Sequence, residues 1–144
     1  MSILRAAALL LCFLAATACG DLLGGDVEGE LERELRSVEG PWQGTSYGSG
    51  LLTLSFQLQE GTGTAVSGSG TMKEASAPAA VPITVTGTFV RPHLSLTFTG
   101  MVFEGHAVQG TFQGDYTTVG GLLEPLHLTG TGYTREIQVL LGED

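Results

Sequence analysis

The sequence predicts an all-β protein: a small antiparallel up-and-down barrel of about eight strands, preceded by a signal peptide and a short amphipathic helix. Three observations predict the barrel. From Trp42 onward, apolar and polar residues alternate with a period of two, which is typical of strands with one buried face. Glycine-rich turn signals recur roughly every 8–12 residues. Finally, no helical pattern separates the strand patterns, and this excludes parallel βαβ units.

The alternation is clearest in the run LLTLSFQLQ, where Leu52, Leu54, Phe56 and Leu58 share one face and the residues between them are polar. The later runs repeat this pattern, separated by signals such as Gly61-Thr62-Gly63. We expect the following apolar residues to point inward: Val66, Met72, Val81, Ile83, Val85, Phe89, Leu94, Leu96, Phe98, Val108, Phe112, Tyr116, Ile137, Val139 and Leu141.

The choice between a closed barrel and a two-sheet sandwich depends on the edges and on the glycines. A closed barrel removes exposed strand edges, which otherwise invite aggregation. Glycine within a strand marks a bend, a bulge or a close backbone approach, and designed barrels use such glycines to relieve curvature. The sequence therefore favours a barrel. The inward positions that are glycine are Gly68, Gly70, Gly87, Gly110 and Gly114.

Several short motifs over residues 41–141 resemble the small calycin-type barrels, the lipocalin-like and avidin-like groups. They are Pro41-Trp42-Gln43-Gly44, Val66-Ser67-Gly68-Ser69-Gly70, Gly87-Thr88-Phe89, Gly110-Thr111-Phe112 and Gly130-Thr131-Gly132. The usual lipocalin opening places glycine before tryptophan, whereas here Trp42 precedes Gly44. The biotin-binding residues of avidin have no counterparts in this chain, so the resemblance implies the fold alone.

Residues 1–18 have the features of a secretory signal peptide. Arg5 is followed by an apolar run over 6–16, which is shorter than the ~20 residues of a membrane span. Ala16-Thr17-Ala18-Cys19 resembles the lipobox of bacterial lipoproteins, with alanine where leucine is commoner. The resemblance implies that Cys19 becomes an acylated N-terminus. The alternative is ordinary secretion with a free thiol.

Residues 19–40 are predicted to form a tether and a short acidic helix. Val27, Leu31, Leu35 and Val38 make one stripe at helical period within Asp26–Gly40, and Gly40-Pro41 ends the element. The stripe needs a partner: the rest of this chain, a second copy, or another envelope protein. The first is favoured. The predicted division of the chain is thus 1–18, 19–40 and 41–144.

The charge of the chain excludes several classes of partner. Its formal net charge is −9, with acids on both sides of residue 40. This balance excludes nucleic-acid binding, which needs a basic footprint. It also disfavours electrostatic attraction to anionic lipid. The expected membrane contact is therefore through acyl chains on Cys19, in the cell envelope, at the outer membrane or cell surface rather than the cytoplasm.

The sequence offers no recognisable catalytic or metal site. His93, His106 and His127 share no metal-ligand spacing. The carboxylates stand mostly at turns without a distinctive pair, and Ser69 lies within a strand pattern rather than at a nucleophile elbow. We therefore expect a protein that is not an enzyme and needs no cofactor.

Two functions remain open from the sequence. In the first, the lipid-anchored barrel binds a small apolar ligand, in a pocket lined by Leu52, Phe56, Phe89, Phe98 and Phe112. In the second, the barrel is solid and the protein is a structural or protein-interaction lipoprotein. The inward glycines discriminate, because neighbouring side chains either fill the space beside them or leave a cavity.

Overall fold

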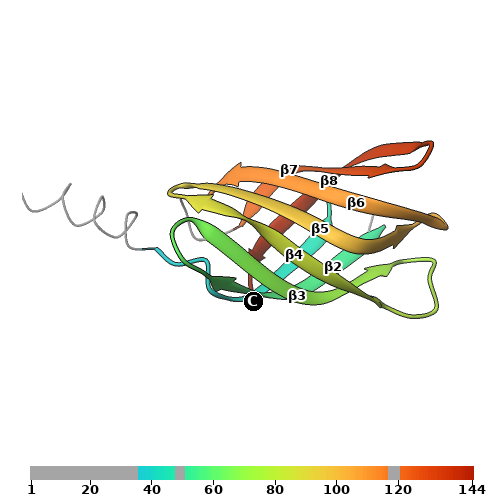
Figure 1. Cartoon of the computed structure of the whole chain (residues 1–144). Coiled ribbons are helices and arrows are strands. Elements are labelled where there is room, and N and C mark those ends of the chain that lie inside the picture. Colours follow the sequence, from blue (N-terminus) through green and yellow to red (C-terminus); the bar gives the residue numbers. More distant parts are fainter. Residues whose placement is uncertain (1–35, 48–50, 117–120) are drawn as a thin grey trace, which may run out of the picture. The chain divides into compact units, whose positions relative to one another are not determined.

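The computed structural model describes residues 36–47, 51–116 and 121–144, and one compact unit comprises Ser37–Asp144. Each strand of this unit pairs antiparallel with the next in sequence, and β1 pairs with β8, so the sheet closes into a barrel (Figure 1). The predicted fold class is confirmed. Within the described residues the strands are β1 (Gly40–Ser46), β2 (Leu52–Glu60), β3 (Ala65–Glu74), β4 (Val81–Val90), β5 (His93–Phe103), β6 (His106–Asp115), β7 (Leu122–Gly130) and β8 (Tyr133–Glu143).

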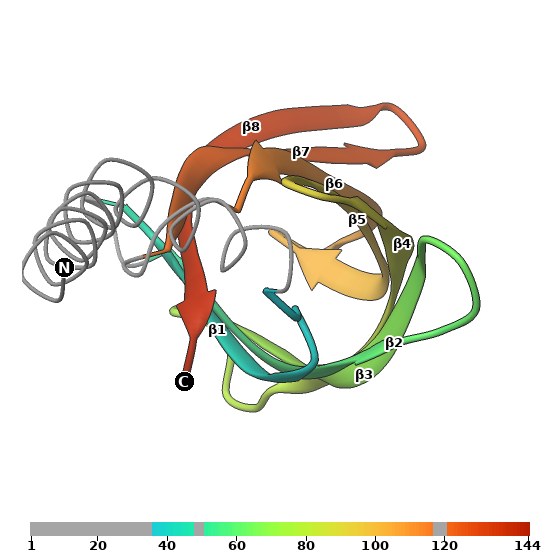
Figure 2. The same cartoon turned by 90° about the vertical axis from the view of Figure 1, so that its left-hand side faces the viewer.

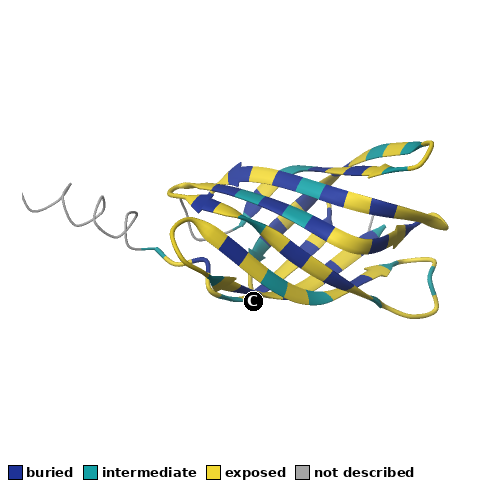
Figure 3. Ribbon diagram, in the orientation of Figure 1, coloured by how far each residue is buried: buried dark blue, intermediate teal, exposed yellow. Residues whose placement is uncertain are grey.

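Every strand presents one face to the interior and one to solvent. Buried and exposed residues alternate along the ribbons, as Figure 3 shows. In β2 the buried residues are Leu52, Leu54, Phe56 and Leu58, so the predicted register of this strand is confirmed. The predicted inward faces of the later strands are also observed, with Val81 half-buried at the start of β4.

One change of phase in β5 escaped the sequence analysis. Between the pairs Phe98–Gly110 and Met101–Val108, β5 contributes two residues and β6 only one, which is a β-bulge. Gly100 adopts a φ of +83° there, a conformation that favours glycine. The extra residue turns Met101 and Phe103 into the interior, where both are fully buried.

The ladder between β6 and β7 is the shortest in the barrel as described. It consists of Gln109–Thr129, Gly110–Leu128 and Thr111–His127, whereas β7 and β8 pair from Leu122–Leu141 to Gly130–Tyr133. Pro125 lies in β7 just beyond the last β6–β7 pair, and proline has no N–H with which to extend a ladder. The join between these two strands, here called the seam, is therefore held by few hydrogen bonds.

The barrel has two ends, named by what closes them. The strap end carries residues 37–39, loop 61–64, the Arg91-Pro92 turn and the C-terminus, and the hairpin end carries loop 75–80 and the turns at 104–105 and 131–132. The hairpin between β5 and β6 turns at Glu104 and Gly105, which both have positive φ. Two such residues suit the tight turn whose twist matches the flanking strands.

The helix predicted over 26–40 does not include the end of that range. Arg36–Glu39 have no regular structure, and Gly40 already belongs to β1. Val38 is fully buried in the barrel core rather than on a helical stripe, so the partner of this one residue is the chain itself. The helical pattern was outweighed because the Val38 N–H is bonded to Glu60, far along the chain. Residues 26–35, and Cys19, lie outside the described residues.

The register of β2 provides a direct test of the fold. We expect Phe56→Ala to lower the free energy of unfolding by about 3–5 kcal/mol, because it truncates a buried aromatic side chain. Gln57→Ala, on the exposed face, should change it by less than about 0.5 kcal/mol. Urea denaturation measures both values. Comparable effects of the two substitutions would contradict this register, since a shift of one residue exchanges the faces.

Candidate functional site

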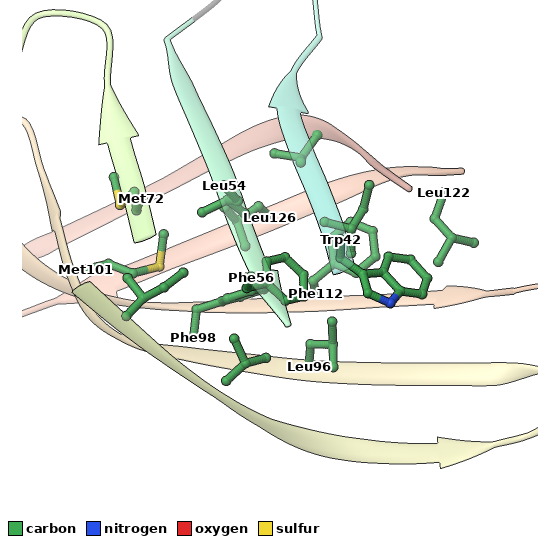
Figure 4. Close-up of a cluster of buried hydrophobic side chains, with 14 of the residues drawn as sticks. Trp42, Leu54, Phe56, Met72, Leu96, Phe98, Met101, Phe112, Leu122 and Leu126 are labelled. Carbon is green, nitrogen blue, oxygen red and sulfur yellow. The ribbon is translucent and has the colours of Figure 1, made fainter. Parts of the chain in front are cut away.

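Side chains from all eight strands fill the barrel interior. In Figure 4, large apolar side chains from several strands converge on one another. The Phe56 and Phe98 rings meet edge to face, with their centroids 5.3 Å apart. Fully buried members of this core include Trp42, Leu52, Met72, Val85, Leu96, Phe98, Met101, Phe112, Leu126 and Val139.

The five residues predicted to line a ligand pocket are divided along the barrel. Phe56, Phe98 and Phe112 come together in the middle, where Figure 4 labels all three. Phe89 lies at the strap end against Tyr116, with their ring centroids 6.4 Å apart, and Leu52 begins β2 at the hairpin end. All five are at most 3% exposed. Their geometry favours packing of the core over the lining of one pocket.

Neighbouring atoms occupy the space beside the inward glycines. A Cβ on Gly110 would lie 2.8 Å from Met101 Sδ and 3.1 Å from Leu126 Cδ1. On Gly68 it would lie 1.9 Å from the carbonyl oxygen of Gln57 in the adjacent strand. These glycines therefore permit close approach of side chains or of backbone, as strand glycines often do.

Several surface hollows lie among the described residues. One measures about 580 Å³ and is lined by residues that include the outward Gln43 and Leu140 and the buried Tyr116. A second, of about 200 Å³, lies on the seam beside Pro125 and Glu124. A third, of about 260 Å³, lies over β2 and β3 and is lined by Phe56 alone of the five predicted ligand residues.

The strap end is closed by Ser37, Val38 and Glu39, here called the strap. Figure 2 looks onto this end and shows the blue-green segment directly before β1 at the mouth of the barrel. The Val38 N–H donates to Glu60 Oε1 at 2.9 Å, and the Val38 carbonyl accepts from Trp42 Nε1 at 2.8 Å. Ser37 Oγ also donates to Glu60 Oε1, at 3.1 Å. Both backbone polar groups of Val38 are thus bonded while its side chain is buried.

The Glu60 carboxylate links the strap to the barrel wall. The hydrogen bond from the Val38 N–H is the main influence that lowers the pKa of Glu60 below its ordinary value of 4.5; the Ser37 hydroxyl and Arg91 lower it further, and partial burial opposes them. Arg91 Nη2 lies 3.2 Å from Glu60 Oε2, and its guanidinium stacks 4.8 Å from the centre of the Phe89 ring. The carboxylate is therefore held charged in a fixed position.

An aromatic cluster lies beneath the strap. The Trp42 and Tyr116 ring centroids are 5.2 Å apart, and Tyr116 also contacts Phe89. The Phe89 N–H donates to the carbonyl of Thr64, which ties the neighbouring loop to this end. The strap therefore covers a preformed aromatic floor.

The hairpin end has a related arrangement. The Tyr133 hydroxyl donates to Glu104 Oε2 at 2.7 Å, and Arg135 pairs with the same carboxylate. The Tyr133 hydroxyl, followed by Arg135, lowers the pKa of Glu104. Desolvation, followed by the bond to Glu104, raises the pKa of Tyr133. This network ties the β5–β6 hairpin to the β7–β8 hairpin, and the Glu104 N–H donates to Glu74 in β3.

The three histidines stand apart from one another. His93 lies 3.0 Å from Asp115 and His127 lies 3.2 Å from Glu136, while the His106 ring stacks on Tyr133. Across residues 36–47, 51–116 and 121–144, no three histidine, cysteine, aspartate or glutamate side chains lie close enough to hold a metal ion. The same residues contain no helix that is long and apolar enough to cross a bilayer.

Comparison of the chain with protein-family models, curated proteins and solved structures finds no match. Glu60 and Arg91 carry no distinguishing signal in the sequence, because each resembles an ordinary charged residue at a strand end. The one local signal near the strap is Val38, four residues before the single tryptophan.

Acid should weaken the strap through Glu60. Because the folded-state pKa is lowered, this carboxylate stabilises the fold fully above its ordinary value of 4.5, and the contribution is lost as the pH falls through the folded pKa. Glu60→Gln keeps an acceptor for Val38 but carries no charge. We expect the variant to lose less stability than the wild type between about pH 7 and about pH 3, measured by urea denaturation. Glu143→Gln, an exposed residue outside the strap contacts, is the control, and coincident profiles for wild type and Glu60→Gln would contradict this role.

Proposed function

We propose that this protein is a non-enzymatic, lipid-anchored envelope protein whose solid barrel serves protein interaction rather than transport of a small ligand. The observation that carries this proposal is the filled interior, where all five predicted ligand residues are buried against their neighbours. Barrels of eight strands have an interior that side chains can just fill. The closed eight-stranded architecture also supports the resemblance to calycin-type barrels.

The two arginine-paired carboxylates support a non-enzymatic role. Glu60 and Glu104 both have a lowered pKa and both pair with arginine. A general acid or base works best with a pKa near the working pH. Carboxylates that are held charged in this way are better suited to anchoring loops and strands than to acid–base catalysis.

The anchor is proposed from the N-terminal sequence. Cys19 follows three small residues at the end of an apolar run that is too short to span a bilayer. Acylation would supply several chains, and each buried methylene contributes about 0.8 kcal/mol to membrane affinity. Membrane attachment then requires no basic surface, which agrees with the net charge of −9.

Cysteine substitution tests the anchor. We expect Cys19→Ala to abolish incorporation of radiolabelled fatty acid and to remove the protein from the membrane fraction, because the thioether attachment is lost. Cys12→Ala is the matched control, since Cys12 lies within the predicted signal peptide. Labelling and membrane retention that persist in Cys19→Ala would exclude lipidation at this residue.

Native mass spectrometry of the protein purified from its own envelope tests the solid core. The expected mass is that of the acylated polypeptide alone, because the interior is already occupied by side chains. Fatty-acid-free albumin in the purification buffer controls for loosely bound lipid. An apolar molecule that co-purifies stoichiometrically, and that dissociates on activation, would favour the ligand-binding function instead.

A further inference from the structure

The strap makes the contacts of a bound peptide. Val38 donates its N–H to Glu60, accepts from Trp42 at its carbonyl, and buries its side chain completely. Together these contacts bind both backbone polar groups of a single residue and enclose its apolar side chain. Pockets that recognise extended peptides combine main-chain hydrogen bonds and a side-chain pocket in this way.

The receiving groups belong to the barrel rather than to the strap. Glu60 ends β2 and is held by Arg91, and Arg91 is stacked on Phe89. Trp42 is part of β1 and packs on Tyr116. These contacts do not involve the strap, so the barrel itself helps to hold the receiving groups in position.

The strap is joined to β1 through a glycine. Gly40 has a φ of +135°, and a Cβ built on it would meet nothing within 4 Å. The positive φ favours glycine at this junction, where Gly40 also pairs with Leu58 of β2. Because the charge of Glu60 is balanced by Arg91, its carboxylate can accept the N–H of an uncharged residue.

We propose that the strap end is a peptide-binding mouth that the strap occupies in cis. Its partner in trans is an extended segment of another protein that carries a small apolar residue preceded by a hydroxyl residue, as in Ser37-Val38. This inference rests on the interaction function proposed above and names the site and the partner chemistry for it.

Trp42 is the single tryptophan of the chain and reports directly on the mouth. In the full chain, Val38→Ser weakens the strap without touching the receiving groups. We expect a red-shifted Trp42 emission and a severalfold rise in quenching by acrylamide, because Trp42 is fully buried beneath the strap. Val90→Ser is the matched control: Val90 ends β4 at the same end of the barrel but is 57% exposed, so it should leave both signals unchanged.

A blocked peptide with the sequence of residues 36–40, RSVEG, is the probe in trans. We expect it to reverse both signals of the Val38→Ser chain in a saturable manner, and to bind at least tenfold more weakly, a difference of about 1.4 kcal/mol, when Glu60→Gln is added. A peptide with aspartate in place of the valine should not reverse them. If Val38→Ser lacks the circular dichroism of a folded barrel, Val38→Ala, a milder truncation of the strap that leaves Glu60 and Trp42 in place, replaces it under the same criterion.

Two results would overturn the proposal: unchanged quenching when the strap is weakened, or a change that RSVEG does not reverse. Concentration-dependent dimers of the unmodified chain, with Trp42 still shielded, would identify a second copy's strap as the occupant and exclude the proposed partner. If the peptide does not bind, the proposed function is still tested separately by the membrane release of Cys19→Ala and by native mass spectrometry. Conversely, a ligand found in the barrel would reject the proposed function without altering the quenching of Trp42.

Discussion

Closure of the sheet between β1 and β8 is the constraint on which the rest of the structure depends. The pairs from Trp42–Glu143 to Ser46–Val139 give the first and last strands a second neighbour. Closure removes both edges and creates an inside. Only then does an alternation of period two become a core, because every second residue of each strand points to the same enclosed space. With aromatic and branched side chains at most of those positions, the enclosed space is filled.

Each end of the closed barrel is secured by the same combination of groups. At the strap end Glu60 pairs with Arg91, whose guanidinium stacks on Phe89. At the hairpin end Glu104 pairs with Arg135, which stacks on Phe103. In both, an arginine covers a core aromatic ring while a carboxylate gathers hydrogen bonds from a neighbouring segment. Two of the six lysine and arginine residues of this acidic chain, Arg91 and Arg135, thus secure the two ends of the barrel.

The strands were predictable because their signal is local. Leu52, Leu54, Phe56 and Leu58 alternate with polar residues, and a closed barrel buries one face of each strand, as that alternation requires. The phase change after Phe98 also has a signal in the sequence. Met101 and Phe103 occupy odd positions, whereas the inward residues of β5 before Gly100 occupy even ones. Val38 could not be placed, because its local spacing is helical while its deciding contact, with Glu60, lies 22 residues away. The inward glycines could not decide between a filled interior and a cavity, because a missing side chain is compatible with both.

The seam has the shortest ladder of the barrel as described, because β6 and β7 share only the pairs from Gln109–Thr129 to Thr111–His127 and Pro125 lies beyond them. Few hydrogen bonds need to break there for the cylinder to become an open sheet. The freed borders of β6 and β7 would then present unpaired backbone groups beside apolar Phe112 and Leu126. Such borders recruit the strands of other molecules. Opening at this one join would therefore turn a molecule without strand edges into one with two.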